Sequence, residues 1–341
     1  MRTIQRFDQV TPAWLSGVLG EEVVSVELST STSNWAQSAS ITARMAGGQS
    51  RKLWLKMCMG SKFGSSEVDY YMRDYIDLPN APLVACHDAC YEPGIGYHVL
   101  LDDLSDDFQD RKTAPPTLEH GLALAEAIAR MGAHHWESGT PPTSSQWDAY
   151  FEHICAGIEP IELETGLSFR ANFDSHEARL RERWSNPTGL TLLHGDINPT
   201  NVLAPKGAES PVYILDRQPF DWTITYGLAV FDLAYSIVPW WPHEFRASHQ
   251  EVILRQWFDI LGQPGYTWEQ AQADWDLSVE HCLHIPIEWC RDSADLERMR
   301  GLWEWQLENI TGQAVQSGRQ RDSANPGFRD TVFAFDAPRV S

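Results

Sequence analysis

Three features are missing from this chain: long apolar runs, closely paired cysteines and an excess of basic residues. No apolar run in the 341 residues approaches the ~18 residues that a membrane-spanning helix needs, and the amino terminus lacks the apolar core of a signal peptide. The six cysteines include no C-x-x-C pair, so the sequence predicts free thiols in a reducing compartment. We therefore expect a cytoplasmic protein with no membrane partner.

Basic residues are scarce, since 26 Lys and Arg stand against 47 Asp and Glu and give a net charge of −21. This balance argues against nucleic acid as a partner. Nearly all of the acidic excess follows residue 100. An acidic second half attracts a cationic substrate by long-range steering, but solubility alone explains the same excess, and charge counts by themselves favour solubility.

The most informative stretch is His194-Gly195-Asp196-Ile197-Asn198-Pro199-Thr200-Asn201. Glycine and proline inside it exclude a regular helix, and short apolar runs on both sides predict strands. A further strand-like run at 213–215 ends in Asp216. Phosphoryl transfer uses this set of groups, because one carboxylate orients the attacking hydroxyl while an Asn and a second Asp bind magnesium. A polar turn without a metal is the alternative.

This pattern resembles the aminoglycoside phosphotransferase and choline kinase-like family, the small-molecule branch of the protein-kinase-like fold, whose loop reads His-x-Asp-x-x-x-x-Asn. The resemblance implies that Asp196 is the catalytic base and that Asn201 and Asp216 bind the Mg²⁺ that accompanies ATP. It also implies an α+β, bilobal fold. A nucleotide-binding lobe with an antiparallel sheet would span residues 1–101, and a mainly helical catalytic and substrate-binding lobe would span residues 102–341.

Lys56 lies near the end of an alternating apolar strand at 52–57, where a lysine is unusual. Glu67 follows eleven residues later and opens a helical stretch that reaches residue 76. A strand lysine paired with a helix glutamate holds the α- and β-phosphates of ATP in this fold. The alternative is a surface lysine and an acid placed favourably near the start of a helix.

Two other segments are expected to contact the nucleotide. Residues 29–40 are polar and contain no glycine, and in a kinase-like lobe they would cover the phosphates, with Ser38 as a contact. A solvated turn is the alternative. The acid-acid-Leu segment that starts at Asp102, directly after Leu101, resembles the hinge whose backbone binds adenine in the family.

The second half carries further signals of the same fold. The apolar stripe over residues 117–136 predicts a helix, at whose end the resemblance gives His135 a packing role. The resemblance also implies that Asp232, at the start of a later helix, supports the catalytic loop by hydrogen bonds. Arg217 departs from the family pattern after Asp216, and it either reaches a phosphate or faces solvent.

Tryptophan gathers in the second half, where 12 of the 15 lie after residue 100. In the family, late helices of the second lobe build the acceptor pocket. Carboxylates beside tryptophans suit a cationic or amphiphilic alcohol, although any single tryptophan more often belongs to a core. The expected acceptor contacts are Glu288, Trp289, Asp292, Trp303 and Glu304.

The sequence therefore predicts an ATP-dependent phosphotransferase that phosphorylates a hydroxyl of a small molecule. The leading acceptor is an antibiotic such as an aminoglycoside, which would make the protein a resistance enzyme. A choline-like amino alcohol, a macrolide, a nucleoside antibiotic and a sugar are the alternatives. A nucleotide-binding regulator without turnover is a different class, which the glycine-free stretch and Arg217 favour. The choice between ATP and GTP, and between monomer and homodimer, stays open.

Overall fold

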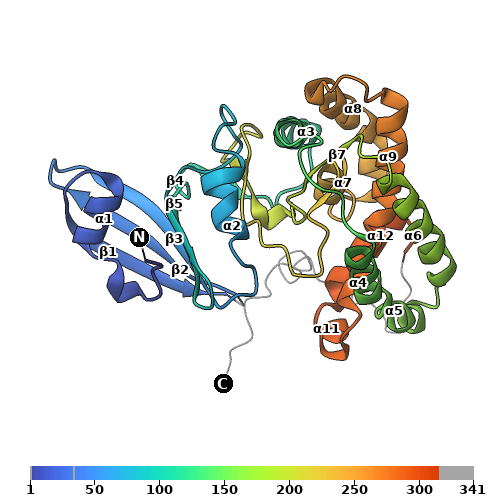
Figure 1. Ribbon diagram of the computed structural model, residues 1–341, viewed down its shortest axis with the longest axis horizontal. Helices are drawn as coiled ribbons and strands as arrows, with labels where there is room; N and C mark the ends of the chain where they lie inside the picture. The colour runs from blue at the N-terminus through green and yellow to red at the C-terminus, as the bar shows by residue number, and fades with distance from the viewer. Residues whose placement is uncertain (1, 34, 315–341) are drawn as a thin grey trace.

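The computed structural model describes residues 2–33 and 35–314. An antiparallel sheet forms the first part of the chain, and helices dominate the rest (Figure 1). This arrangement confirms the expected α+β class. The division at residues 101 and 102 stays a prediction, and the tail from Ser317 onward lies outside the described residues.

The N-terminal sheet has five strands in the order β1-β2-β3-β5-β4, with every neighbouring pair antiparallel. Side chains alternate along β3, so that Leu53, Leu55 and Met57 are fully buried on one face while Lys56 lies on the other. The strands are β1 (Val23–Thr32), β2 (Gln37–Met45), β3 (Ser50–Met59), β4 (Cys86–Glu92) and β5 (Gly96–Asp102).

Helix α1 (Pro12–Leu19) contributes Leu15 to the small core on one face of this sheet. The Thr11 hydroxyl accepts from the Trp14 amide at 3.1 Å and caps the helix start. Gly20 ends the helix with a φ of 70°, a conformation that favours glycine. The single turn η1 (Phe7–Gln9) precedes α1.

The polar stretch at 29–40 is mostly strand, so the prediction of a loop there was wrong. Strand β1 continues to Thr32 and β2 begins at Gln37, which leaves only a short turn, with Asn34 outside the described residues. Thr30 pairs with Ala39, and Ser31 pairs with Ser38. Hydrogen bonding between the two strands therefore extends through the Ser and Thr residues, and β-branched threonine fits that extended backbone well.

Helix α2 (Ser66–Asp69) continues directly into the π-helical turn η2 (Tyr70–Asp74). In Figure 1 this segment lies between the sheet and the helical part of the molecule. Tyr70 is fully buried, and its hydroxyl donates to Ile214 O at 3.0 Å. The segment therefore joins the sheet to the second part of the chain.

Helix α3 (Leu118–His134) confirms the helix expected at 117–136. It packs closely on α8 (His243–Leu261) because Gly121 has no side chain, and a Cβ there would lie 2.5 Å from Ile253 Cδ1. The other helices are α4 (Ser144–Cys155), α5 (Ile158–Thr165), α6 (Arg170–Trp184), α7 (Phe231–Ile237), α9 (Trp268–His281), α10 (His284–Trp289), α11 (Ser293–Arg298) and α12 (Arg300–Thr311).

Two small antiparallel sheets frame the segment at 193–201, which we call the catalytic loop after the role that the family resemblance implies for it. Before it, β7 (Leu190–Leu192) pairs with β10 (Tyr226–Leu228). After it comes a three-stranded sheet of β6 (Phe108–Asp110), β8 (Val202–Pro205) and β9 (Tyr213–Ile214). The loop contains Gly195 at a φ of 82° and the short turn η3 (Pro199–Asn201), so it is irregular, as the sequence predicts.

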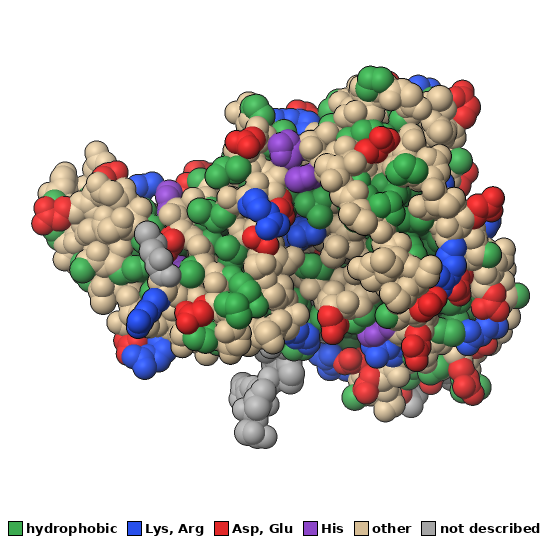
Figure 2. All heavy atoms as spheres, viewed as in Figure 1, with side chains coloured by type: hydrophobic (Ala, Val, Ile, Leu, Met, Phe, Trp, Pro, Cys, Tyr) green, Lys and Arg blue, Asp and Glu red, His purple; other side chains and the backbone are tan. Residues whose placement is uncertain are grey.

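Two expectations about composition can be followed in the fold. All six thiols are free. On the face that Figure 2 displays, acidic and basic side chains are intermixed over the helical part. Across 2–33 and 35–314, no helix has both the length and the apolar character to cross a membrane.

Candidate active site

Three charged side chains from distant segments meet where the sheet faces the second part of the chain. Lys56 Nζ of β3 lies 3.1 Å from Glu67 Oε1 of α2, and it also pairs with Asp216 Oδ1 just after β9. Burial opposes the charge on Lys56, but the two carboxylates outweigh it and raise its pKa. Burial also raises the pKa of Glu67 against the attraction of Lys56. We call these three side chains the ion cluster.

Two residues of the ion cluster's surroundings were missed in the sequence. The Tyr97 hydroxyl of β5 donates to Glu67 Oε2. The Gln218 amide contacts that hydroxyl, and in the amide orientation that satisfies its neighbours the nitrogen donates to Asp216 Oδ1 at 3.1 Å and the oxygen accepts from Lys56 Nζ at 3.3 Å. Gln218 could have been found as a polar residue two positions after Asp216, whereas Tyr97 depends on the pairing of β5 with β3.

Asp196 is half-buried in the catalytic loop and accepts hydrogen bonds on both carboxylate oxygens. Asn198 Nδ2 and the Tyr235 hydroxyl donate to Oδ1 at 2.9 and 2.7 Å, and Asn201 Nδ2 donates to Oδ2 at 3.2 Å. Burial raises the pKa of Asp196 to about 6, with help from the charge of Asp216 and against these hydrogen bonds. The carboxylate is therefore oriented and more basic than an ordinary Asp.

Buried groups hold the loop around Asp196. Asp232 accepts from the backbone amides of His194 at 2.7 Å and Gly195 at 2.9 Å. Burial lowers the pKa of His194 to about 3, so its ring is neutral. With Nε2 donating to Leu215 O at 2.9 Å, its Nδ1 accepts from the Asp196 amide at 3.2 Å. Hydrogen bonds to Asp232 and His194 therefore hold the backbone of the loop that carries Asp196 in place.

Arg217 does not face solvent, so that expectation from the sequence was wrong, while its contact with a phosphate stays a prediction. The side chain is 4% exposed. Its Nε donates to Leu193 O at 2.9 Å, and one terminal nitrogen donates to Ser66 Oγ at 3.0 Å and lies 3.9 Å from Asp74 Oδ2. Arg217 therefore links the segment that bears Glu67 to the start of the catalytic loop.

The residues expected to bind the nucleotide lie on β2 and β5, two inner strands of the sheet. Ser38 is half-buried on β2 and pairs directly with Lys56 of β3. Leu101 is buried near the end of β5. The backbone amide of Asp102 donates to Ala85 O at 3.0 Å, so the strands already use that donor. The contacts of these residues with a nucleotide stay predictions.

Two of the expected acceptor residues have structural partners away from the ion cluster. Trp303 has no exposed surface, and its indole nitrogen donates to Leu296 O at 3.0 Å, which makes it part of the core. Asp292 is exposed and caps α11, because its carboxylate accepts from the Ala294 amide at 2.8 Å.

The remaining three lie on α10 and α12. Glu288 Oε1 is 3.2 Å from His153 Nε2, and Trp289 beside it is half-buried. Glu304 is 6% exposed and lies 3.6 Å from a terminal nitrogen of Arg300. The side-chain hydrogen bonds to the Asp196 carboxylate come from Asn198, Asn201 and Tyr235 and not from these five residues, whose contact with an acceptor stays a prediction.

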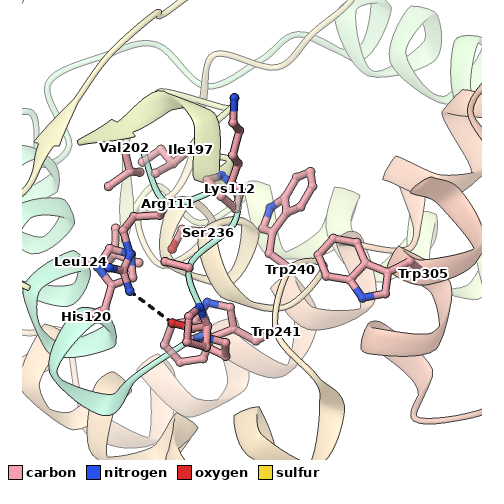
Figure 3. Close-up of a pocket in the computed structure, with 14 residues that line it drawn as sticks. Arg111, Lys112, His120, Leu124, Ile197, Val202, Ser236, Trp240, Trp241 and Trp305 are labelled. Atoms are coloured by element: carbon pink, nitrogen blue, oxygen red, sulfur yellow. Dashed lines mark hydrogen bonds between the residues drawn. The ribbon is translucent and has the colours of Figure 1, made fainter. Parts of the chain in front are cut away.

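A pocket that the sequence did not predict opens beside the catalytic loop (Figure 3). Ile197 and Pro199 of that loop line one side of it. Its other lining residues include the three tryptophans Trp240, Trp241 and Trp305, together with Arg111, Lys112 and His120.

Solved structures similar to this chain include an aminoglycoside-3'-phosphotransferase of type VIII, with 20% identity, a TM-score of 0.45, and coverage of 76% of this chain and 93% of that one. A candidate fructosamine-3-kinase from Thermobifida fusca has 13% identity, a TM-score of 0.47, and coverage of 88% and 98%. A thermostable mutant of an aminoglycoside phosphotransferase, in ternary complex with AMP-PNP and hygromycin B, has 15% identity, a TM-score of 0.48, and coverage of 89% and 98%. No family model and no curated protein matches the sequence.

Proposed function

We propose that this protein is an ATP-dependent phosphotransferase that phosphorylates a hydroxyl of a small molecule. One observation carries the proposal: the ion cluster of Lys56, Glu67 and Asp216 lies next to a loop that presents Asp196 as an oriented, basic carboxylate. Phosphoryl transfer needs a cation for the phosphates, oxygen ligands for magnesium and a carboxylate for the attacking hydroxyl. These residues supply all three.

Lys56 supplies the charge that holds the nucleotide's phosphates. Glu67 and the Tyr97 hydroxyl keep the ammonium group in place, and Asp216 is its second partner. When phosphate oxygens arrive, Lys56 exchanges Asp216 for them while it keeps Glu67, because the Glu67 side chain is 2% exposed and cannot reach another cation. Nucleotide binding therefore releases the Asp216 carboxylate.

Asn201 and Asp216 fit a magnesium ion. Asn201 donates its amide nitrogen to Asp196, which leaves its oxygen as a ligand, and the Asp216 side chain is 37% exposed. Within the described residues, no three His, Cys, Asp or Glu side chains gather into a metal site. Magnesium prefers oxygen ligands and often takes one carboxylate together with substrate phosphates, and when bound it neutralises phosphate charge.

Asp196 accepts the proton of the attacking hydroxyl. Its hydrogen bonds from Asn198, Asn201 and Tyr235 fix the direction of the carboxylate. Proton removal contributes less than positioning, because the transition state of phosphoryl transfer is loose and carries most of its charge on the transferred group.

The acceptor is proposed from chemistry only. The sequence favoured an aminoglycoside and a role in resistance, because acids on the late helices would pair with ammonium groups. In the structure these acids have protein partners: Glu288 with His153, Asp292 with the start of α11, and Glu304 with Arg300. Choline analogues, macrolides, nucleoside antibiotics and sugars therefore belong in the same panel as aminoglycosides.

The experiment measures ADP release from magnesium-ATP with each acceptor class, with the Asp196→Asn variant as control. An acceptor that stimulates release in the parent protein, but not in a variant that still binds ATP, would support the proposal. ATP binding without stimulation by any class would favour the regulator predicted as the alternative. A protein that binds no magnesium-ATP would contradict both.

A further inference from the structure

The pocket in Figure 3 lies next to the proposed base. Ile197 and Pro199, which line it, are the first and third residues after Asp196. The opposite side comes from the start of α3, where His120 and Leu124 face the pocket. The pocket therefore lies beside the segment that carries Asp196.

Aromatic rings connect the base to the pocket. Tyr235, whose hydroxyl donates to Asp196 Oδ1, has its ring centroid 6.3 Å from the ring of Trp240. The ring of Trp305 lies 6.1 Å beyond Trp240, and Trp241 lines the pocket next to it. Three tryptophans around one open space favour a flat apolar group that stacks on their rings.

Two polar groups of the pocket have unused donors or acceptors. Arg111 is 9% exposed and lies 3.1 Å from Glu209, but its Nε has no hydrogen-bond partner in the described part of the chain. His120 Nδ1 also lacks one there, at 3.7 Å from Glu209 Oε2. Burial and the Arg111 charge lower the pKa of His120 to about 3, so its ring is neutral. A buried guanidinium with an unused N–H is costly unless a ligand oxygen accepts from it.

The charges around the pocket also favour a ligand oxygen over a polycationic ligand. Arg111 and Lys112 line it, and no Asp or Glu is among the described residues that do. Glu209 lies 3.1 Å from Arg111 and Asp110 lies 3.6 Å from Lys112, so these two carboxylates are already paired, and the described lining offers no further carboxylate to a polycation. An oxygen of a carbonyl or carboxylate would instead complete the partners of Arg111.

We propose that this pocket binds the non-reacting part of the acceptor, and that this part is a flat apolar group bearing a carbonyl or carboxylate oxygen directed at Arg111. The inference rests on the proposed function, because the acceptor's hydroxyl must reach Asp196. Under this proposal, aromatic or polycyclic alcohols that are neutral or anionic are better acceptors than polycationic aminoglycosides.

Calorimetric titration of the full chain with two matched probes tests the proposal. The probes are 6-hydroxy-2-naphthoate and (6-hydroxy-2-naphthyl)methylammonium, which share one ring system and differ in charge. We expect the carboxylate to bind at least about tenfold more tightly than the ammonium. Equal affinity, or tighter binding of the ammonium, would overturn the assignment.

Substitutions of pocket residues test whether the probes bind in this pocket. Trp305→Ala, at a half-buried position, should weaken the carboxylate probe by about tenfold, since one wall of the pocket is lost. Lys112→Glu, at a side chain that is 42% exposed, should weaken the carboxylate and strengthen the ammonium. The control is Trp268→Ala on α9, whose ring contacts Arg255 and not the pocket. Unchanged affinity in Trp305→Ala would place the probe elsewhere and contradict the proposal.

AMP-PNP binding, measured on the same samples, separates this inference from the proposed function. If the carboxylate probe binds through Trp305 but AMP-PNP does not bind, the pocket's preference for a flat, anionic ligand holds while the kinase proposal, and with it the role as acceptor site, fails. If AMP-PNP binds and the carboxylate shows no preference over the ammonium, the kinase proposal holds and the pocket assignment fails.

Discussion

At the scale of single residues, the protonation of Asp196 sets an expected pH profile. A base must be ionised, and the pKa of Asp196 is raised to about 6 by burial. We expect kcat/KM to be level above this pH and to fall about tenfold per pH unit below it, as the carboxylate takes up a proton. Initial rates of ADP release between pH 5 and 8 would measure the inflection.

Tyr235→Phe provides the matched variant for this profile. The Tyr235 hydroxyl donates to Asp196 Oδ1 and thereby lowers its pKa, so its removal should move the inflection to higher pH while nucleotide affinity stays the same. An inflection at the same pH in both proteins would mean that another group controls the rate.

Arg217 carries a second prediction at this scale, because it joins Leu193, the first residue of the catalytic loop, to Ser66 next to Glu67. Arg217→Met removes the guanidinium and leaves Leu193 O and Ser66 Oγ without its donors, whereas Asp74 keeps Arg73 at 3.0 Å. We expect kcat to fall at least about tenfold, with a smaller change in the dissociation constant of AMP-PNP, because the position of the loop changes more than the phosphate site.

Arg217→Lys restores the charge but not the two separate donors, so it should recover only part of kcat. A parallel loss of folding stability and activity in both variants, with no split between kcat and nucleotide affinity, would reduce Arg217 to a purely structural role. The comparison needs saturating acceptor and unfolding curves recorded under the same conditions.

At the scale of elements, local signals in the sequence predict most of what the structure contains. The cap at Thr11 and the terminal Gly20 define α1, and the apolar stripe defines α3. The run of Ser and Thr after residue 28 resembles a loop when it is seen alone. It becomes strand because β2 lies beside it and continues the ladder to Thr32, which a local window does not contain.

The residues of the candidate site also differ in whether local sequence signals predict them. Lys56 and Glu67 could be predicted because a strand followed by a helix places them in order along the chain. Tyr97 and Arg217 could not, because their partners depend on the pairing of β5 with β3 and on how α2 packs against the segment after β9. The residues that line the pocket span positions 111 to 305, so no local sequence pattern predicts it.

Asp292 provides a prediction at this scale, because it distinguishes a helix cap from an acceptor contact. Asp292→Ala removes the acceptor of the Ala294 amide and should cost about 1 kcal/mol of unfolding free energy, measured by urea denaturation. Asp292→Asn keeps a capping oxygen and should be nearly neutral. If Asp292→Asn instead raises KM for a cationic acceptor at unchanged stability, the substrate role predicted from the sequence is correct.

At the scale of the whole molecule, the two parts of the chain meet through several polar contacts, and three of them involve the candidate site or its neighbours. Lys56 with Asp216, Arg217 with Ser66 and Tyr70 with Ile214 all connect the first hundred residues to the second part. The first of these pairs is the one that a nucleotide would break. Nucleotide binding should therefore change how the two parts are held together, while Arg217 and Tyr70 keep them in register.

Buried neutral histidines carry the last prediction, which concerns the stability of the whole fold in acid. Burial lowers the pKa of His176 to about 4 and that of His194 to about 3, and it lowers the pKa of His281 and His284. The Tyr150 hydroxyl lies 2.6 Å from His281 Nε2 and 2.9 Å from His284 Nδ1, so both rings are tied to one neutral group.

The direction of the effect follows from these shifts. An unfolded histidine titrates near 6.5, so below that pH the unfolded chain binds more protons than the folded one, and stability is lost as pH falls. Each such histidine costs roughly 1.4 kcal/mol per pH unit once the pH lies between its two pKa values. Asp196 and Asp232 act in the opposite direction, because burial raises the pKa of each to about 6. Burial also raises the pKa of Glu67 and Asp276, while it lowers the pKa of His120 and His135. In the described part of the chain, six such histidines therefore outnumber these four carboxyls, so we expect the net free energy of unfolding to fall from pH 6.5 to pH 4.5.

Urea unfolding followed by tryptophan fluorescence at several pH values in this range measures the loss. His176→Gln, which removes one buried histidine of the group, should reduce the slope of stability against pH, whereas His249→Gln at a half-buried position on α8 should leave it unchanged. A flat profile would mean that the carboxyls balance the histidines. An unchanged slope in His176→Gln would mean that His176 titrates alike in both states, and the acid sensitivity would then belong to the other buried histidines.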